Sequence, residues 1–141
     1  MNKKLMILDY ATLEREHRWL DWGIGDIVQG LAYTHQLGLV SRETAVVSRI
    51  NNKLATWGIE PYLSKKLFCN DKSYRECYRW LMGELGKNAG ETIVVDDEYK
   101  RGVRVGRELG CETYLIVREG ITAPRKIAPT KVIHSLADLL R

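Results

Sequence analysis

Short apolar runs alternate with longer amphipathic stretches along the chain. The apolar runs are rich in β-branched and aliphatic residues, as is typical of buried strands, and occupy residues 5–8, 44–47, 92–95 and 113–117, with weaker runs at 67–69 and 131–133. Between them, apolar residues recur at helical spacing over residues 24–36, 74–85 and about 100–109. Ser73 is a candidate N-cap for the second helix, and a glycine follows each helix as a stop signal, namely Gly38, Gly86 and Gly110.

This alternation predicts an α/β fold. Strands that alternate with helices form a mainly parallel sheet with helices on both faces, so we expect a Rossmann-like three-layer α/β/α architecture with five or six strands. The 141 residues contain no repeat or linker, which predicts a single domain over residues 1–141. A chain of this length buries roughly two thirds of its unfolded surface.

Acidic residues end two of the predicted strands. Asp9 follows the run at residues 5–8, and Asp96 and Asp97 follow the run at residues 92–95. Ligands of open α/β folds bind at the carboxyl edge of the sheet, so the carboxylates converge there if the two strands are neighbours. Magnesium prefers such oxygen ligands. The alternative is that Asp9 caps the following turn, whereas the adjacent acids Asp96 and Asp97 repel each other and need a cation, hydrogen bonds or solvent.

Two further polar residues lie at predicted element boundaries. Ser48 ends the run at residues 44–47; its hydroxyl either caps the next helix or, with adjacent backbone N–H groups, holds a phosphate. Lys72 precedes the helix at residues 74–85, where a lone lysine is ordinarily a solvated loop residue.

In this order, the residues resemble the motifs of the haloacid dehalogenase-like (HAD) superfamily over nearly the whole chain. Asp9, in the segment Leu-Asp-Tyr-Ala-Thr-Leu, resembles the first motif, and Ser48 resembles the second. Lys72 resembles the third motif, and the pair Asp96 and Asp97 the fourth. The resemblance implies a HAD-like fold without a cap domain, because the segments between the motifs are too short to hold one.

The resemblance also implies a chemistry, that of a magnesium-dependent phosphohydrolase acting on a phosphorylated substrate through an aspartyl-phosphate. It assigns Asp9 as the nucleophile and as a Mg²⁺ ligand, and it assigns phosphoryl binding to Ser48 and Lys72. The remaining implied metal contacts are the backbone carbonyl of Ala11, Asp97, and Asp96 in the second shell of the ion or through water.

One position departs from the pattern of active phosphatases in this family. They carry a second Asp two residues after the nucleophile, where this chain has Ala11. Alanine cannot transfer a proton, and the loss of general acid–base help should cost about 10²–10⁴-fold in rate, or roughly 3–5 kcal/mol of barrier. The sequence thus leaves two main alternatives, a slow phosphohydrolase and a catalytically impaired protein that binds a phosphate ligand, a metal or a protein partner. A third is an unrelated α/β binding domain whose edge carboxylates are turn residues.

The expected lack of a cap bears on what covers the substrate. An oligomeric partner (a homo-oligomer), a macromolecular substrate or a predicted loop over residues 14–25 would have to exclude water. That segment contains Arg15, Arg18, Trp19 and Trp22, which either bind a phosphorylated or stacked ligand or, for the tryptophans, pack on the sheet edge.

Composition narrows the partners. Lys and Arg number 22 against 18 Asp and Glu, and this net charge of +4 is scattered, which disfavours nucleic acid and fits a phosphorylated small molecule or macromolecule. No apolar run is long enough to cross a membrane or to serve as a signal peptide, so we expect a cytoplasmic protein. The three cysteines lack metal-type spacing and are expected to be reduced thiols.

Overall fold

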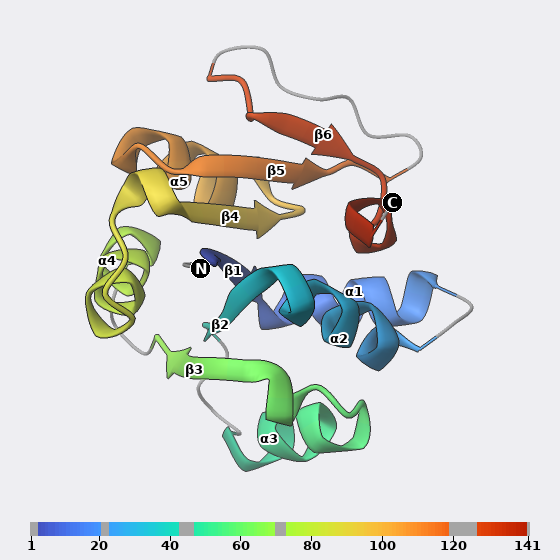
Figure 1. Ribbon diagram of the computed structural model, residues 1–141. Coiled ribbons are helices and arrows are strands. Elements are labelled where there is room, and N and C mark those ends of the chain that lie inside the picture. Colours follow the sequence, from blue (N-terminus) through green and yellow to red (C-terminus); the bar gives the residue numbers. More distant parts are fainter. Residues whose placement is uncertain (1–2, 21–22, 43–46, 70–72, 119–126, 141) are drawn as a thin grey trace.

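The computed structural model describes residues 3–20, 23–42, 47–69, 73–118 and 127–140, and its centre is a six-stranded sheet (Figure 1). All neighbouring strands are parallel, and their order is β3-β2-β1-β4-β5-β6. The strands are β1 (Lys4–Asp9), β2 (His35–Ser41), β3 (Leu63–Phe68), β4 (Thr92–Asp96), β5 (Glu112–Ile116) and β6 (Lys131–Ile133). The predicted α/β class is confirmed, with β1 and β4 side by side in the middle of the sheet.

Helices cover both faces of this sheet. They are α1 (Tyr10–Trp19), α2 (Ile24–Thr34), α3 (Val47–Thr56), α4 (Tyr74–Glu84) and α5 (Arg104–Leu109), with a π-helical turn, η3 (Tyr99–Val103), before α5. In Figure 1, α1, α2 and α3 lie on one side of the sheet and α4 and α5 on the other. No helix of the described residues is both long enough and apolar enough to cross a membrane.

The two hydrophobic layers follow from the alternation of side chains along β1. Met6 and Leu8 point into the cluster formed with α1, α2 and α3, while Leu5 and Ile7 point into the cluster formed with α4. Successive residues of a strand face opposite sides, so one continuous apolar run supplies both cores. This is the three-layer architecture expected from the sequence.

The second strand differs from the prediction. Val47 begins α3 rather than ending a strand, and residues 44–46 lie outside the described residues. The strand is instead His35–Ser41, which follows α2 with no intervening turn. Gly38 is therefore not a helix stop but the middle of β2, where an added Cβ would lie 3.5 Å from Leu5 and 3.6 Å from Leu81.

Other boundaries are closer to expectation. Ser73 caps α4 in a capping box with Glu76, and Gly110 ends α5 with a positive φ of 91°, as predicted. The predicted loop over residues 14–25 is wrong in its first part, because α1 continues through Trp19. Trp19 is 54% exposed, so it does not pack in the core; Trp22 lies outside the described residues.

The cysteines also differ from expectation. Cys69 follows β3 and forms a disulfide with Cys77 on α4, with their Cα atoms 6.5 Å apart. Cys111 is free and buried. The expectation of reduced thiols is therefore wrong for Cys69 and Cys77.

Candidate active site

The sheet places two acidic residues at its carboxyl edge. Leu8 of β1 pairs in register with Val95 of β4. Asp9 and Asp96, the next residues along the chain, therefore end neighbouring strands side by side. Both line a cavity of about 200 Å³. The residues that line this cavity are Asp9, Ala11, Arg15, Ser41, Arg42, Tyr74, Asp96, Glu98 and Arg101.

Asp9 is held by the first turn of α1. It is the N-cap, and its Oδ2 accepts hydrogen bonds from the backbone N–H of Thr12 at 3.2 Å and from the Thr12 hydroxyl at 3.4 Å. On the other side, the Tyr74 hydroxyl donates to Asp9 Oδ1 at 3.4 Å. Asp9 is only 5% exposed, and this burial raises its pKa to about 6. The carboxylate is oriented by its partners but poorly solvated.

Asp96 lies beside Asp9 and is also buried. Its Oδ1 accepts the Thr12 hydroxyl at 3.1 Å and the backbone N–H of Glu98 at 2.9 Å. Burial, and then the charge of Asp9, raise its pKa well above the ordinary value. The π-helical turn η3 closes tightly over it, because a Cβ at Gly102 would lie 2.2 Å from Asp96 Oδ2. A side chain at position 102 therefore cannot fit without moving Asp96.

Asp97 is turned towards two arginines. Arg15 donates to it twice, from Nε at 2.5 Å and from Nη2 at 2.7 Å, and Arg118 donates from Nη1 at 2.7 Å. Although burial opposes ionisation, the hydrogen bonds from Arg15 and Arg118 hold the pKa of Asp97 at about 2. The Thr12 hydroxyl lies within hydrogen-bond distance of Asp9, Asp96 and Asp97, and its single proton is donated to one of these carboxylates at a time. Asp97 is not among the residues that line the cavity.

The ion-pair network continues to Glu16, which is fully buried. Glu16 Oε2 accepts Arg118 Nη2 at 2.8 Å, and its Oε1 accepts the backbone N–H of Leu136 at 2.6 Å and the Ser135 hydroxyl at 3.1 Å. One carboxylate on α1 thus connects the end of the chain to the arginine that orients Asp97.

We expect Glu16→Ala to lower the free energy of unfolding by about 3–5 kcal/mol, because it leaves Arg118, whose side chain is only 12% exposed, without one of its partners. Urea denaturation followed by circular dichroism measures this. The matched control is Glu14→Ala on the same helix. Glu14 is partly exposed and pairs with Lys53 and Arg18, so its loss should cost no more than about 1 kcal/mol. Equal losses in the two variants would contradict a structural role for the Glu16 network.

The structure brings together some of the predicted site residues. Asp9, Ala11 and Asp96 line one cavity, with Asp97 adjacent. Ser48 does not take part, because it lies exposed in the first turn of α3 and no strand ends there, so its predicted place after the second strand is wrong. Lys72 lies outside the described residues.

Five residues of the cavity were not anticipated, and two of them, Glu98 and Arg101, come from the segment after β4. Ser41 stands at the end of β2, where Ser48 had been expected, Arg42 follows it, and Tyr74 comes from the start of α4. The segment that leads to Ser41 is apolar, which was the available signal, but it continues from a helical pattern without a turn and was assigned to the wrong element.

The cavity fits a magnesium ion better at Asp96 than at Asp97. Among the described residues no group of three or more His, Cys, Asp or Glu side chains is arranged to hold a metal. Magnesium, however, takes one or two carboxylates and completes its shell with water and other oxygens. Asp9 and Asp96 are two buried, mutually repelling carboxylates, and Ala11 lies at the same wall. Asp97 already has two cationic partners.

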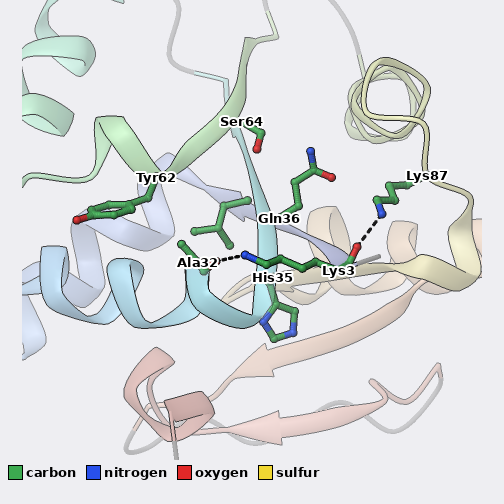
Figure 2. Close-up of a pocket in the computed structure, with 8 residues that line it drawn as sticks. Lys3, Ala32, His35, Gln36, Tyr62, Ser64 and Lys87 are labelled. Atoms are coloured by element: carbon green, nitrogen blue, oxygen red, sulfur yellow. Dashed lines mark hydrogen bonds between the residues drawn. The ribbon is translucent and has the colours of Figure 1, made fainter. Parts of the chain in front are cut away.

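A second hollow, about 380 Å³, lies at the opposite, amino edge of the sheet (Figure 2). Its polar side chains include Lys3 and Lys87, whose ammonium groups donate to the backbone carbonyls of Ala32 and Lys3. It is larger than the cavity at Asp9, but these lysines are exposed and already bound to main chain. The chemistry of buried carboxylates makes the cavity at Asp9 the candidate active site.

Sequence comparison supports the HAD resemblance. Residues 70–139 match the model of a family described as HAD-hydrolase-like. No curated protein matches the chain significantly.

Three solved structures share the fold. An uncharacterised protein from Listeria monocytogenes serotype 4b has a TM-score of 0.75 at 15% identity, over 97% of this chain and 94% of that chain. A HAD phosphatase from Thermococcus onnurineus has a TM-score of 0.69 at 16% identity, over 98% and 96%.

YfnB from Bacillus subtilis, described as a candidate HAD-hydrolase and bound to magnesium, has a TM-score of 0.71 at 20% identity. The match covers 83% of this chain and 53% of YfnB, so this chain spans about half of that protein's length. Within the described residues no cap domain stands over the carboxyl edge of the sheet. The chain has the fold of the haloacid dehalogenase-like hydrolases, its second half matches their family model, and the resemblance inferred from the sequence is confirmed.

Proposed function

We propose that the protein is a magnesium-dependent phosphohydrolase that acts through an aspartyl-phosphate on Asp9. The observation that carries this proposal is the pair of buried carboxylates, Asp9 and Asp96, facing one cavity with a raised pKa on each. Ionisation of both carboxylates is energetically unfavourable without a nearby cation. Buried groups with such strongly shifted pKa values are found mainly at active sites.

Each lining residue has a chemical role in this reaction. Asp9 attacks phosphorus, and its orientation is fixed by Thr12 and Tyr74. Asp9, Asp96 and the carbonyl of Ala11 would hold the magnesium ion, which would supply positive charge opposite the phosphoryl oxygens. The Ser41 hydroxyl lies where it can bind one of these oxygens, in the role that the resemblance had given to Ser48. Lys72 remains a predicted partner of the phosphoryl group.

The second candidate function is a catalytically impaired protein that binds a phosphate ligand, a metal or a protein partner. Ala11 favours it, because the cavity wall lacks the acid of active phosphatases. The presence of a candidate nucleophile, Asp9, a candidate metal-binding carboxylate, Asp96, and a candidate phosphate-binding hydroxyl, Ser41, favours the enzyme. Binding of magnesium is common to both candidates, whereas turnover that depends on Asp9 distinguishes them.

Magnesium should raise the melting temperature of the protein, and Asp96 rather than Asp97 should be responsible. At a magnesium concentration 100 times the dissociation constant, binding should raise the free energy of unfolding by about 2.7 kcal/mol. We expect Asp96→Asn to lose this shift. We expect Asp97→Asn to keep it, even though that variant starts from a lower melting temperature because Arg15 loses its anionic partner and Arg118 loses one of its two. Thermal scans with magnesium or with a chelator measure both. The reverse result would make Asp97 the metal ligand.

A further inference from the structure

The carboxyl groups that line the cavity are all engaged. Oδ2 of Asp9 caps α1, and its other oxygen contacts Tyr74. Asp96 accepts the Glu98 N–H and the Thr12 hydroxyl, and the Glu98 carboxylate forms an ion pair with Arg101. Ala11, which also lines the cavity, has no acidic side chain. None of these groups is placed to give a proton to a departing alkoxide.

Two residues with hydroxyl groups, Ser41 and Tyr74, also line the cavity, and Ser41 has the phosphoryl-binding role proposed above. The Tyr74 hydroxyl already donates its proton to Asp9 Oδ1, 3.4 Å away. Tyr74 therefore positions the nucleophile, and the leaving group must depart without a proton from the described cavity wall.

The rim of the cavity holds a cation suited to such a departure. Arg42 directly follows Ser41, and its guanidinium lies over the Tyr74 ring, 5.2 Å from the ring centroid. Of the described residues, no carboxylate forms an ion pair with Arg42, whereas Arg15 and Arg101 each have one. A guanidinium binds carboxylate and phosphate oxygens in a bidentate manner. Arg42 is thus placed to receive an anionic leaving group.

We infer that the substrates are mixed or simple phosphoric anhydrides, such as acyl phosphates and pyrophosphates, and that Arg42 binds the departing anion. This inference rests on the proposed function. In the first step an oxygen of Asp9 forms a bond to phosphorus while the bond from phosphorus to the leaving oxygen breaks. The electron pair stays on that oxygen, which departs as a carboxylate or phosphate and needs no proton. In the second step water attacks phosphorus, Asp9 is regenerated as a carboxylate, and phosphate and a proton are released.

Acetyl phosphate and glycerol phosphate form a pair of probes with a good and a poor leaving group. In the presence of magnesium, kcat/KM for acetyl phosphate should exceed that for glycerol phosphate by about 10³-fold or more, because the alkoxide of glycerol phosphate receives no general-acid help. Acetyl phosphate is intrinsically more reactive than glycerol phosphate, so part of this ratio does not depend on the enzyme. The same ratio measured with the Ala11→Asp variant serves as the reference. An added acid helps only the poor leaving group, and the ratio should fall by about 10²-fold or more.

The role of Arg42 is tested in the same assay. Arg42→Gln should lower kcat/KM for acetyl phosphate by about 10²-fold, and Arg42→Lys should recover part of the loss. Arg79→Gln, an exposed arginine of α4 outside the cavity, is the matched control and should leave the rate unchanged.

The failures of the two proposals are distinguishable. Asp9-dependent hydrolysis of glycerol phosphate as fast as that of acetyl phosphate, or an Arg42→Gln variant as active as the wild type, overturns the anhydride inference alone. Absence of Asp9-dependent turnover of both probes overturns the proposed function and the inference with it.

Discussion

Asp9→Asn is expected to abolish magnesium-dependent hydrolysis of p-nitrophenyl phosphate, with a loss of about 10⁴-fold or more in kcat/KM. The carboxylate is the group that forms the bond to phosphorus, and an amide is not a nucleophile of comparable strength. The substitution changes one atom and keeps the oxygen that accepts the Thr12 N–H, since Asn and Asp are equally good N-caps. Steady-state kinetics with magnesium and with a chelator measure the effect, and unchanged turnover would remove Asp9 as the nucleophile.

The thermal stability of Asp9→Asn distinguishes a loss of chemistry from a loss of folding. Because the pKa of Asp9 is raised to about 6 in the folded protein, its ionised form destabilises the fold at pH values above about 6 and not at pH values well below 4. Without metal at neutral pH, Asp9→Asn should therefore unfold at a higher temperature than the wild type. Asp9→Ala, which also loses the cap, should gain less. If Asp9→Asn loses activity but is more stable than the wild type, the loss results from the missing nucleophile and not from unfolding.

Ala11→Asp is expected to raise the hydrolysis of alkyl phosphates by about 10²–10⁴-fold, which is the usual contribution of a positioned general acid and base. Ala11 lies in the first turn of α1, one residue after its start, and is one of the residues that line the cavity. That turn has no acidic residue, and a carboxylate there interacts favourably with the helix dipole, so the fold should tolerate the change.

The matched control for this gain is Ala11→Asn. Asparagine has almost the same size as aspartate but cannot exchange a proton at neutral pH, so it should not raise kcat. Both variants are compared by kcat and KM for glycerol phosphate. A gain in both variants would point to packing or substrate binding, and no gain in either would show that the cavity lacks more than a proton donor.

The sequence was sufficient for the fold because the central strands are continuous apolar runs. Residues 5–8 and 92–95 fill both faces of the sheet, so their pattern identifies buried parallel strands without further information. The helix caps at Ser73 and Gly110 were predictable for a local reason, since each depends on backbone bonds within one turn.

The second strand could not be read in this way. Thr34 ends α2 and His35 begins β2, so no turn residue marks the change of period. Gly38 also has the appearance of a helix stop in the sequence, whereas in the fold it lies in the middle of β2, where an added Cβ would be in ordinary contact with Leu81 of α4. This error displaced the candidate hydroxyl by seven positions along the chain, from Ser41 to Ser48.

The partner of Asp9 was likewise beyond the sequence. Asp96 and Asp97 are adjacent in the chain, and only the tertiary structure shows that Arg15 and Arg118 take the second while the first faces the cavity. The roles of these residues in metal binding and catalysis remain predictions.

The buried contact between Glu16 and the main chain of Leu136 spans 120 residues. During synthesis on the ribosome, α1 is made long before Leu136. Glu16 therefore has no main-chain partner at Leu136 until nearly all of the described residues have been synthesised. Leu136 follows all six strands in the chain, so this contact can form only after every strand of the sheet has been synthesised. Because the same carboxylate steadies Arg118, and through it Asp97, the nascent protein should acquire its cavity only after its sheet is essentially complete.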